Sequence, residues 1–498
     1  MRGFCLCMIL LLTGMALAQQ PPSTAEALFE RARSLDKADS FFKARHYYQK
    51  ALTACTSEEK TRIADACRSA LTRIRGITET YALTEQDLRK QIKQLYPDIT
   101  DSLMDKIFVE KRLAHLEIAG TVYYFTDSMN TLYHLYPALR QTKQPGALGR
   151  VHAFLNTMDA YVHDKETLTS GQIRHKPLRF EVSGRVVIPA DILPDSGLLQ
   201  VWLPLPIVTA NQPCVEILDL YPRQHVVYPI QQDGDIGLVY LEIPLAEAQR
   251  PLRIGFTLRL RHFAQRFTFD REIAAYDRES WLYKRYTASA GNIALTPGIR
   301  ERAVRLAGEE TNPLEVARRF YAHVVYELDY SFTPHLALSA LNIPESEFVL
   351  HHGYGDCGAQ SMYFAALCRA VGIPARVPGG WQLFPGPQSH CGAHFWAQIF
   401  LPNYGWVPVD TSVGQLAKYM DGIQEQKREA FIHFFFGNLD PFRYVIQTDV
   451  DIPFVPDPGD ALLFDTVLQM PAVLCREKPA LVFYVMDHWQ MQAKPVEN

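Results

Sequence analysis

The spacing of apolar residues changes twice along the chain. From about residue 23 to residue 176, apolar side chains recur at intervals of three and four, which is the period of amphipathic helices. From about 177 to 268 they alternate with polar residues, as in the run from Leu252 to Arg261, and this is the period of strands with one buried face. Beyond about 270 helical spacing returns, followed by short strand-like runs. The pattern predicts an α+β protein, in which a helical region and an antiparallel β-sandwich precede a mixed region of helices and strands.

We place the domain boundaries where this spacing changes. Within the parts, Ala119-Gly120 has the composition of a hairpin turn, and the run ALVFYVM (480–486) has the composition of a strand. The expected parts are a leader at 1–18, a mainly helical region at 19–176, a β-sandwich at 177–268, a mixed core at 269–440 and a β-rich extension at 441–498.

The first residues, MRGFCLCMILLLTGMALA, have the layout of a secretory signal peptide. One arginine precedes an apolar run, and Ala16-Leu17-Ala18 offers a small-residue cleavage site. The run is shorter than the 20 or so apolar residues that span a bilayer. We therefore expect export to the periplasm or the exterior, cleavage after about Ala18, and no stable membrane insertion afterwards.

Composition narrows the class of protein further. Apolar residues make up 48% of the chain, which suffices for several buried cores, and the formal net charge is -4. The sequence contains no long run of lysine or arginine, which argues against a nucleic-acid partner. The oligomeric state is left open.

The segment YGDCGAQSMYFAALCRAVGIPAR (354–376) predicts a buried helix that starts at a cysteine. The helix should run from about Cys357 to Val371, because Gly372 suits a left-handed cap and Pro374 prevents continuation. Cys357 would then lie at the positive end of the helix macrodipole, which favours thiolate over thiol. Free backbone N–H groups at this end could stabilise an oxyanion.

A second segment, AHFWAQIFLPNYGWVPVD (393–410), predicts two strands joined by a three-residue connection. This register places Phe400 opposite Trp406, and it puts Asp410 on the same face as His394. A carboxylate in that position can orient the imidazole, which can take a proton from the thiol. On the same face, Trp396 and Trp406 would pack the core, shield the ion pair from water, or do both.

These blocks resemble the transglutaminase-like superfamily, whose members have a papain-like fold with a Cys-His-Asp triad. The matching motifs are Gly355-Asp356-Cys357, Cys368 to Arg376, His394 with Trp396, and Gly405 to Asp410. The resemblance implies a nucleophile at Cys357, a general base at His394 and an orienting group at Asp410. Gln398 stands where the family pattern has glutamate, and a neutral amide does not supply the charge of that glutamate.

The resemblance implies an exported enzyme that acts on amide bonds of peptides or proteins through a thioester. Hydrolysis, as in a peptidase or amidase, is favoured over crosslinking. The alternative is a scaffold protein whose core binds a partner without turnover. This thiol chemistry requires neither a cofactor nor a metal.

Other residues near these motifs allow further interpretations. We expect Cys368 to be core, Cys391 to pack or lie in a loop, and Asp440 and Arg443 to form a structural ion pair. His390 is an alternative base, but strand alternation favours His394. Zinc is conceivable because Cys391-x-x-His394 has ligand-like spacing, although a second clear pair is lacking. The side chains considered for a metal are His351, His352, Cys357, His390, Cys391 and His394.

Overall fold

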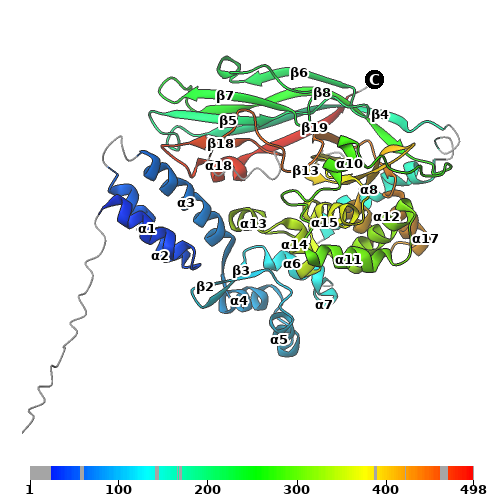
Figure 1. Ribbon diagram of the computed structural model, residues 1–498, viewed down its shortest axis with the longest axis horizontal. Coiled ribbons are helices and arrows are strands. Elements are labelled where there is room, and N and C mark those ends of the chain that lie inside the picture. Colours follow the sequence, from blue (N-terminus) through cyan, green and yellow to red (C-terminus); the bar gives the residue numbers. More distant parts are fainter. Residues whose placement is uncertain are drawn as a thin grey trace, which may run out of the picture. The chain divides into compact units, whose positions relative to one another are not determined.

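The computed structural model describes most of the 498-residue chain (Figure 1). The described residues are 24–55, 61–140, 145–164, 167, 171–385, 390–420, 422–459 and 469–496. The predicted signal peptide lies outside these residues. The chain divides into two units, Met1–Ala70 and Leu71–Asn498, and helix α3 crosses the boundary.

The first unit contains a pair of helices and the first half of α3. Tyr48 of α2 packs against Phe29 of α1, with 5.8 Å between ring centroids, and its hydroxyl donates to Asp36. Thr24 caps α1 by accepting a hydrogen bond from the N–H of Ala27. The helices are α1 (Ala25–Asp36), α2 (Phe41–Thr53) and α3 (Thr61–Thr80).

The second unit begins with helices around a small antiparallel sheet of order β1-β3-β2. Ile118 pairs with Thr121, and Ala119 and Gly120 both have positive φ, so the predicted hairpin turn is confirmed. The elements are β1 (Tyr81–Thr84), α4 (Glu85–Leu95), α5 (Asp101–Val109), β2 (His115–Ile118), β3 (Thr121–Phe125), α6 (Ser128–Leu135), α7 (Pro137–Arg140) and α8 (Pro145–Val162).

Two antiparallel sheets follow, and the predicted alternation is visible in their burial. Along β8, Ile254, Leu258 and Leu260 are buried while Arg253 and Arg259 are exposed. One sheet has the order β16-β8-β4-β19 with β6 also paired to β8, and the other has the order β18-β5-β7. The strands from the middle of the chain are β4 (Arg174–Ile188), β5 (Leu198–Pro204), β6 (Cys214–Tyr221), β7 (Leu238–Pro244) and β8 (Leu252–Arg266), with η2 (Arg223–His225) between β6 and β7.

Strands from the end of the chain complete both sheets, which the sequence did not reveal. Strand β18 (Ala472–Cys475) pairs with β5, and β19 (Gln490–Val496) pairs with β4 along its whole length. In Figure 1 these red strands lie beside the green and teal strands, at an edge of each sheet. The mixed α+β fold with an antiparallel sandwich is confirmed, while the domain boundaries stay predictions.

The mixed core lies between these strands in sequence and packs helices against short sheets of order β11-β14-β15 and β13-β12-β17. A separate parallel pair joins β9 and β10. The elements are α10 (Trp281–Tyr286), α11 (Pro297–Ala307), α12 (Pro313–Ala322), η3 (His323–Glu327), β9 (Asp329–Tyr330), α13 (His335–Leu341), α14 (Glu345–His352), β10 (Tyr354–Gly355), α15 (Cys357–Ala370), β11 (Ala375–Arg376), β12 (Gly379–Phe384), β13 (His390–Phe395), β14 (Ala397–Leu401), β15 (Gly405–Val409), α16 (Thr411–Leu416), η4 (Ala417–Tyr419), α17 (Glu425–Phe434), β16 (Asn438–Leu439) and β17 (Arg443–Gln447).

One predicted strand is wrong, because the run ALVFYVM is helical. It forms most of α18 (Leu481–His488), whose side chains Leu481, Val482 and Val485 are buried. A continuous apolar run of this length has no period that separates a buried strand from a buried helix, so tertiary packing decides between them.

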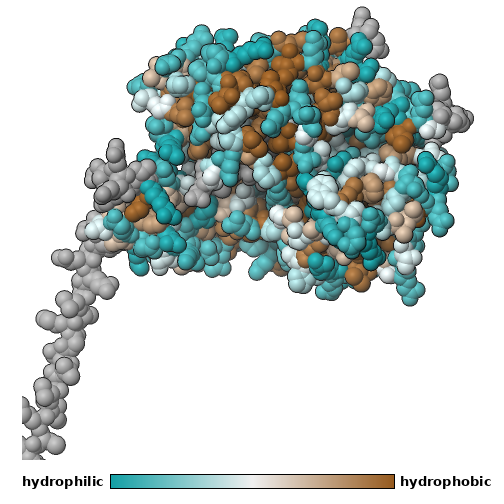
Figure 2. All heavy atoms as spheres, turned by 45° about the horizontal axis from the view of Figure 1, so that its top comes forward, coloured by the Kyte–Doolittle hydropathy of each residue, from teal (hydrophilic) through white to brown (hydrophobic). Residues whose placement is uncertain are grey.

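Apolar surface gathers on the side of the second unit that carries the two sheets (Figure 2). The exposed large apolar residues there include Val187, Leu198, Leu218, Val227 and Tyr228. Among the helices of the described residues, none combines the length and apolar character that crossing a bilayer requires.

Candidate active site

Cys357 is the first residue of helix α15, as predicted, and it remains half-buried. The rest of this helix is almost entirely buried, so the thiol marks the point where it meets accessible surface. The Cys357 Sγ lies 3.9 Å from the backbone carbonyl oxygen of Ala393, to which the thiol can donate. The next residue, Gly358, lies close to Phe395: a Cβ there would come within 3.3 Å of its ring. The start of α15 therefore packs against the strand that carries His394.

The helix N-terminus differs from the prediction in one respect. The Asp356 Oδ1 accepts hydrogen bonds from the N–H groups of both Gly358 and Ala359, at 3.1 Å each. The prediction that these N–H groups are free is therefore wrong, because the capping carboxylate uses them. The N–H of Cys357 itself, at the first helical position, has no intrahelical acceptor.

His394 and Asp410 meet as the predicted register requires. The Nε2 of His394 lies 2.8 Å from the Oδ2 of Asp410, and both side chains are buried. Phe400 pairs with Trp406, which confirms the three-residue connection. Because Nε2 faces the carboxylate, Nδ1 is the ring nitrogen left to exchange a proton with another group.

The strand that carries His394 is broken, unlike the predicted continuous one. Strand β13 ends at Phe395 and β14 begins at Ala397, and the two belong to different sheets. Trp396 lies at the break, with its N–H bonded to the carbonyl of Pro378. The break lets His394 sit in one sheet while Asp410 follows a strand of the other.

Asp410 is a fully buried carboxylate with four hydrogen-bond donors around it. Its Oδ2 faces His394 and the Nη1 of Arg443, at 2.9 Å, while its Oδ1 accepts from the N–H of Val413 and the hydroxyl of Ser412. Burial alone would raise the pKa of Asp410, but the charges and hydrogen bonds of His394, Arg443 and Val413 hold that pKa below its usual range.

Arg443 forms two ion pairs, and the sequence predicted only one of them. It pairs with Asp440, as predicted, and it also reaches Asp410, 33 residues earlier in the chain. All three side chains are fully buried. The i,i+3 spacing indicated the first ion pair, but no local pattern indicates the second, which connects Arg443 to the candidate site.

Trp396 and Trp406 have different neighbours in the structure. Trp396 is buried and lies stacked on His394 with 6.0 Å between ring centroids, and Arg443 lies 4.8 Å from its ring centroid. Trp406 packs against Phe400 and against Tyr286. Trp396 therefore limits the approach of water to the imidazole, while the half-buried Trp406 packs against other residues.

Gln398 forms a hydrogen bond at the position where the family pattern has glutamate. Its Oε1 accepts from the Nε of Arg376 at 2.8 Å, and the guanidinium of Arg376 lies 4.1 Å from the ring centroid of Trp406. Burial lowers the pKa of Arg376. The neutral amide therefore supplies the acceptor, although not the charge, that a glutamate would provide.

The surroundings of Cys357 raise the pKa of its thiol, whereas the sequence predicted an environment that favours the thiolate. Burial raises the pKa of the Cys357 thiol, and the carboxylates of Asp356 and Asp410 raise it further, while the N–H groups of Phe395 and Gly358 lower it. The helix terminus therefore does not outweigh burial and the neighbouring negative charges.

The remaining candidate cysteines and histidines that the structure describes occupy positions that fit a structural role. Cys368 is fully buried, as predicted, and Cys391 is half-buried, with burial raising the pKa of its thiol to about 11. His351 pairs with Glu347, and His352 donates to the carbonyl of Phe348, so each bonds within helix α14. The side chain of His390 lies outside the described residues.

Among the described residues, one group brings three potential metal ligands within 4.8 Å of one another, namely His335, Glu345 and Asp356. Both imidazole nitrogens of His335 face carboxylate oxygens at 2.5 Å. With a proton on each nitrogen, the ring donates a hydrogen bond to each carboxylate.

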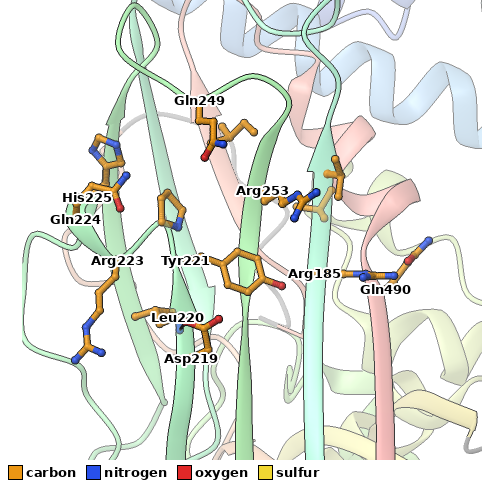
Figure 3. Close-up of a pocket in the computed structure, with 14 residues that line it drawn as sticks. Arg185, Asp219, Leu220, Tyr221, Arg223, Gln224, His225, Gln249, Arg253 and Gln490 are labelled. Atoms are coloured by element: carbon orange, nitrogen blue, oxygen red, sulfur yellow. Dashed lines mark hydrogen bonds between the residues drawn. The ribbon is translucent and has the colours of Figure 1, made fainter.

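A pocket of about 740 Å³ lies elsewhere, on the outer face of the β-sandwich (Figure 3). Its lining includes Arg185, Tyr221 and Arg253 from strands β4, β6 and β8. Neither Cys357 nor any residue bonded to it lines this pocket.

Comparison with known families identifies the part of the chain around Cys357. The model of the Transglutaminase-like superfamily matches residues 300–411, which contain Cys357, His394 and Asp410. Residues 300–411 are a transglutaminase-like domain. An uncharacterized protein of Haemophilus influenzae is 24% identical to the chain over 183 residues, which cover 32% of this chain and 48% of that protein. The chain thus spans about half the length of this curated relative.

Two solved structures are similar to larger shares of the chain. A candidate cysteine protease from Cytophaga hutchinsonii is 12% identical, with a TM-score of 0.40 over 65% of this chain and 93% of that one. The periplasmic domain of TgpA from Pseudomonas aeruginosa, bound to ethylmercury, is 18% identical, with a TM-score of 0.24 over 48% of this chain and 91% of that one.

Proposed function

We propose that the transglutaminase-like domain is a cysteine enzyme that acts on amide bonds of peptides or proteins through a thioester intermediate. The observation that carries this proposal is the position of the Cys357 sulfur beside the backbone of Ala393, next to a histidine that is bonded to a buried aspartate. Cys357 would be the nucleophile, His394 the general base and Asp410 the group that orients the imidazole.

In the first step, the Nδ1 of His394 takes the thiol proton while the sulfur attacks the amide carbonyl carbon. The negative charge that develops on the carbonyl oxygen can be stabilised by the N–H of Cys357. The carbon–nitrogen bond then breaks, the protonated imidazole gives its proton to the departing amine, and a thioester remains on Cys357. Asp410 stabilises the imidazolium, because its own charge is held by Arg443 and Val413.

Hydrolysis is the second step that we propose. Water, deprotonated by His394, attacks the thioester, releases a carboxylic acid and returns the thiol. Crosslinking would instead need a second substrate whose amine reaches the thioester before water does. Hydrolysis makes no such demand on the site, and we therefore favour a peptidase or amidase over a protein-crosslinking enzyme.

We further propose that the protein is exported, on the basis of its N-terminal sequence, and that its substrates are peptides, proteins or cell-wall peptides outside the cytoplasm. No nucleic acid takes part.

A specific observation favours a second candidate, a scaffold protein that binds a partner without turnover. Burial and the charge of Asp356 raise the pKa of the Cys357 thiol, which disfavours a resting thiolate. A catalytic thiol must then be deprotonated during the attack itself, while a scaffold needs no deprotonation.

One experiment separates these functions. The mature protein and its Cys357→Ala variant are incubated with a peptide library, with and without an added primary amine, and the products are analysed by mass spectrometry. Cleaved or deamidated peptides indicate hydrolysis, and peptides that carry the amine indicate transamidation. Turnover that persists in the variant would exclude Cys357 as nucleophile, and a lack of any product would favour the scaffold.

A further inference from the structure

Three consecutive helices of the transglutaminase-like domain bring their N-terminal ends together behind Cys357. His335 is the first residue of α13, Glu345 is the first residue of α14, and Asp356 caps α15. The His335 Nδ1 lies 2.5 Å from the Oε1 of Glu345, and its Nε2 lies 2.5 Å from the Oδ2 of Asp356. The imidazole thus bridges two carboxylates.

This geometry favours a positive charge on the ring. Ionised carboxylates only accept hydrogen bonds, so a ring that bonds to two of them carries a proton on both nitrogens and is an imidazolium. Glu345 is 2% exposed, and its second oxygen has no hydrogen-bond partner among the described atoms. A carboxylate buried in this way requires a counter-charge, and His335 supplies it. Burial alone would lower the pKa of His335, but Asp356 and Glu345 raise it well above its usual value.

Asp356 connects this cluster to the thiol. Its Oδ2 bonds to His335, while its Oδ1 accepts from the N–H groups of Gly358 and Ala359. The carboxylate is therefore fixed beside Cys357 by the helix that the thiol begins. Its negative charge opposes a thiolate at Cys357.

We propose that His335 is a positioning residue whose imidazolium charge compensates Asp356 and so favours formation of the nucleophilic thiolate at Cys357. His335 does not touch the thiol and acts through the capping carboxylate. The inference rests on the proposed role of Cys357 as nucleophile. The side chain of His335 is 45% exposed, so solvent and salt moderate the compensation without removing it.

Other titratable groups lie near Cys357 and near Glu345. Asp410 and Tyr330 face Cys357 in addition to Asp356, and Asp451 faces Glu345 in addition to His335. His394 also lies next to Cys357, where it is the proposed proton acceptor and is bonded to Asp410. Within the cluster of His335, Glu345 and Asp356, His335 is the positive group.

The test measures the thiol directly and does not depend on turnover. The rate at which iodoacetamide alkylates Cys357 is followed by peptide mass spectrometry from about pH 6 to pH 12 in the full protein, a range that reaches high pH because the pKa of the thiol is raised, and the midpoint of the rate against pH gives its apparent pKa. In His335→Gln the midpoint should rise by about half a unit or more, because the charge of Asp356 is no longer compensated. His335→Lys, which keeps a positive charge, should bring the midpoint back toward the wild-type value.

A double-mutant cycle tests the path through Asp356. Asp356→Asn keeps a capping side chain but removes the charge, so its midpoint should fall below that of the wild type. Adding His335→Gln to this variant should then cause no further rise. His351→Gln is the matched control, because His351 forms a comparable pair with Glu347 at 2.9 Å on the surface of α14, and its midpoint should not change.

An unchanged midpoint in His335→Gln would overturn the inference, provided that circular dichroism shows a folded protein. So would an equal rise in the presence and absence of the Asp356 charge. If His335→Gln and His335→Lys both unfold, His335 is a structural residue and the inference is also overturned. Shifted midpoints without peptide turnover would refute the proposed enzyme function and leave the electrostatic role intact, while a Cys357 that is inert at every pH would contradict both.

Discussion

Arg443 and Asp410 form an ion pair with 2.9 Å between Nη1 and Oδ2, and both side chains are fully buried. The same Asp410 oxygen also accepts from His394. Arg443 further pairs with Asp440, so one guanidinium supplies positive charge to two buried carboxylates. The position of the imidazole and the stability of this part of the core therefore depend on a common residue.

Replacing Arg443 with methionine should destabilise the protein by about 3–5 kcal/mol, because two buried carboxylates lose their counter-charge. Urea unfolding followed by circular dichroism measures the change. Arg305→Ala is the control, since Arg305 and Glu301 form an exposed pair at 3.8 Å, and its effect should stay below about 1 kcal/mol. Similar losses in the two variants would contradict the importance of the buried network.

Asp410→Asn should reduce peptide turnover by roughly a thousandfold or more, because an amide neither fixes the useful tautomer of His394 nor stabilises its protonated form. Steady-state kinetics on a cleaved peptide measure the loss, and the thermal melt shows whether the fold persists. A folded variant with turnover near that of the wild type would exclude Asp410 as the orienting group.

His262 should make the protein less stable in mild acid. It is fully buried, its ring nitrogens have no hydrogen-bond partner among the described atoms, and burial, with Arg443, lowers its pKa to about 3. An unfolded histidine titrates near pH 6.5, so unfolding takes up a proton between these values. This residue's contribution to the free energy of unfolding should therefore fall by about 1.4 kcal/mol per unit as the pH drops from about 6.5 toward 3.

The measurement compares the wild type with His262→Phe by urea unfolding at several pH values. The variant should lose less stability on acidification, and the difference between the two proteins isolates the histidine from the titrating carboxylates. His433→Phe, at an exposed position, should behave like the wild type. Parallel pH dependences in His262→Phe and the wild type would show that His262 does not titrate as inferred.

Gln398→Leu should cost about 1–3 kcal/mol, because it removes the acceptor of the Arg376 guanidinium. Gln398→Glu, which restores the residue of the family pattern, should change the free energy of unfolding by less than about 1 kcal/mol. Equilibrium unfolding of both variants tests the comparison. A glutamate variant that is less stable than the leucine variant would show that the site does not accept a carboxylate.

Features that depend on residues close together in sequence were predictable. The turn at Ala119-Gly120 follows from backbone conformations that glycine adopts easily, and the pairing of Phe400 with Trp406 follows from the alternation of side chains around a short connection. The start of α15 at Cys357 follows from its capping aspartate, and its end follows from Gly372. In these cases the local chain chemistry and the fold agree.

The sequence by itself thus determined the transglutaminase-like domain, the mixed α+β class and the pairing of His394 with Asp410. The tertiary structure alone decided that 480–486 is a helix, that strands from the chain end complete the sandwich, that Arg443 holds Asp410, and that His335 faces Asp356. The last three features join residues distant in the chain, the helix at 480–486 depends on its packing, and the energies of all four come from burial and charge compensation. Such terms depend on which surfaces meet after folding, and no spacing along the chain encodes them.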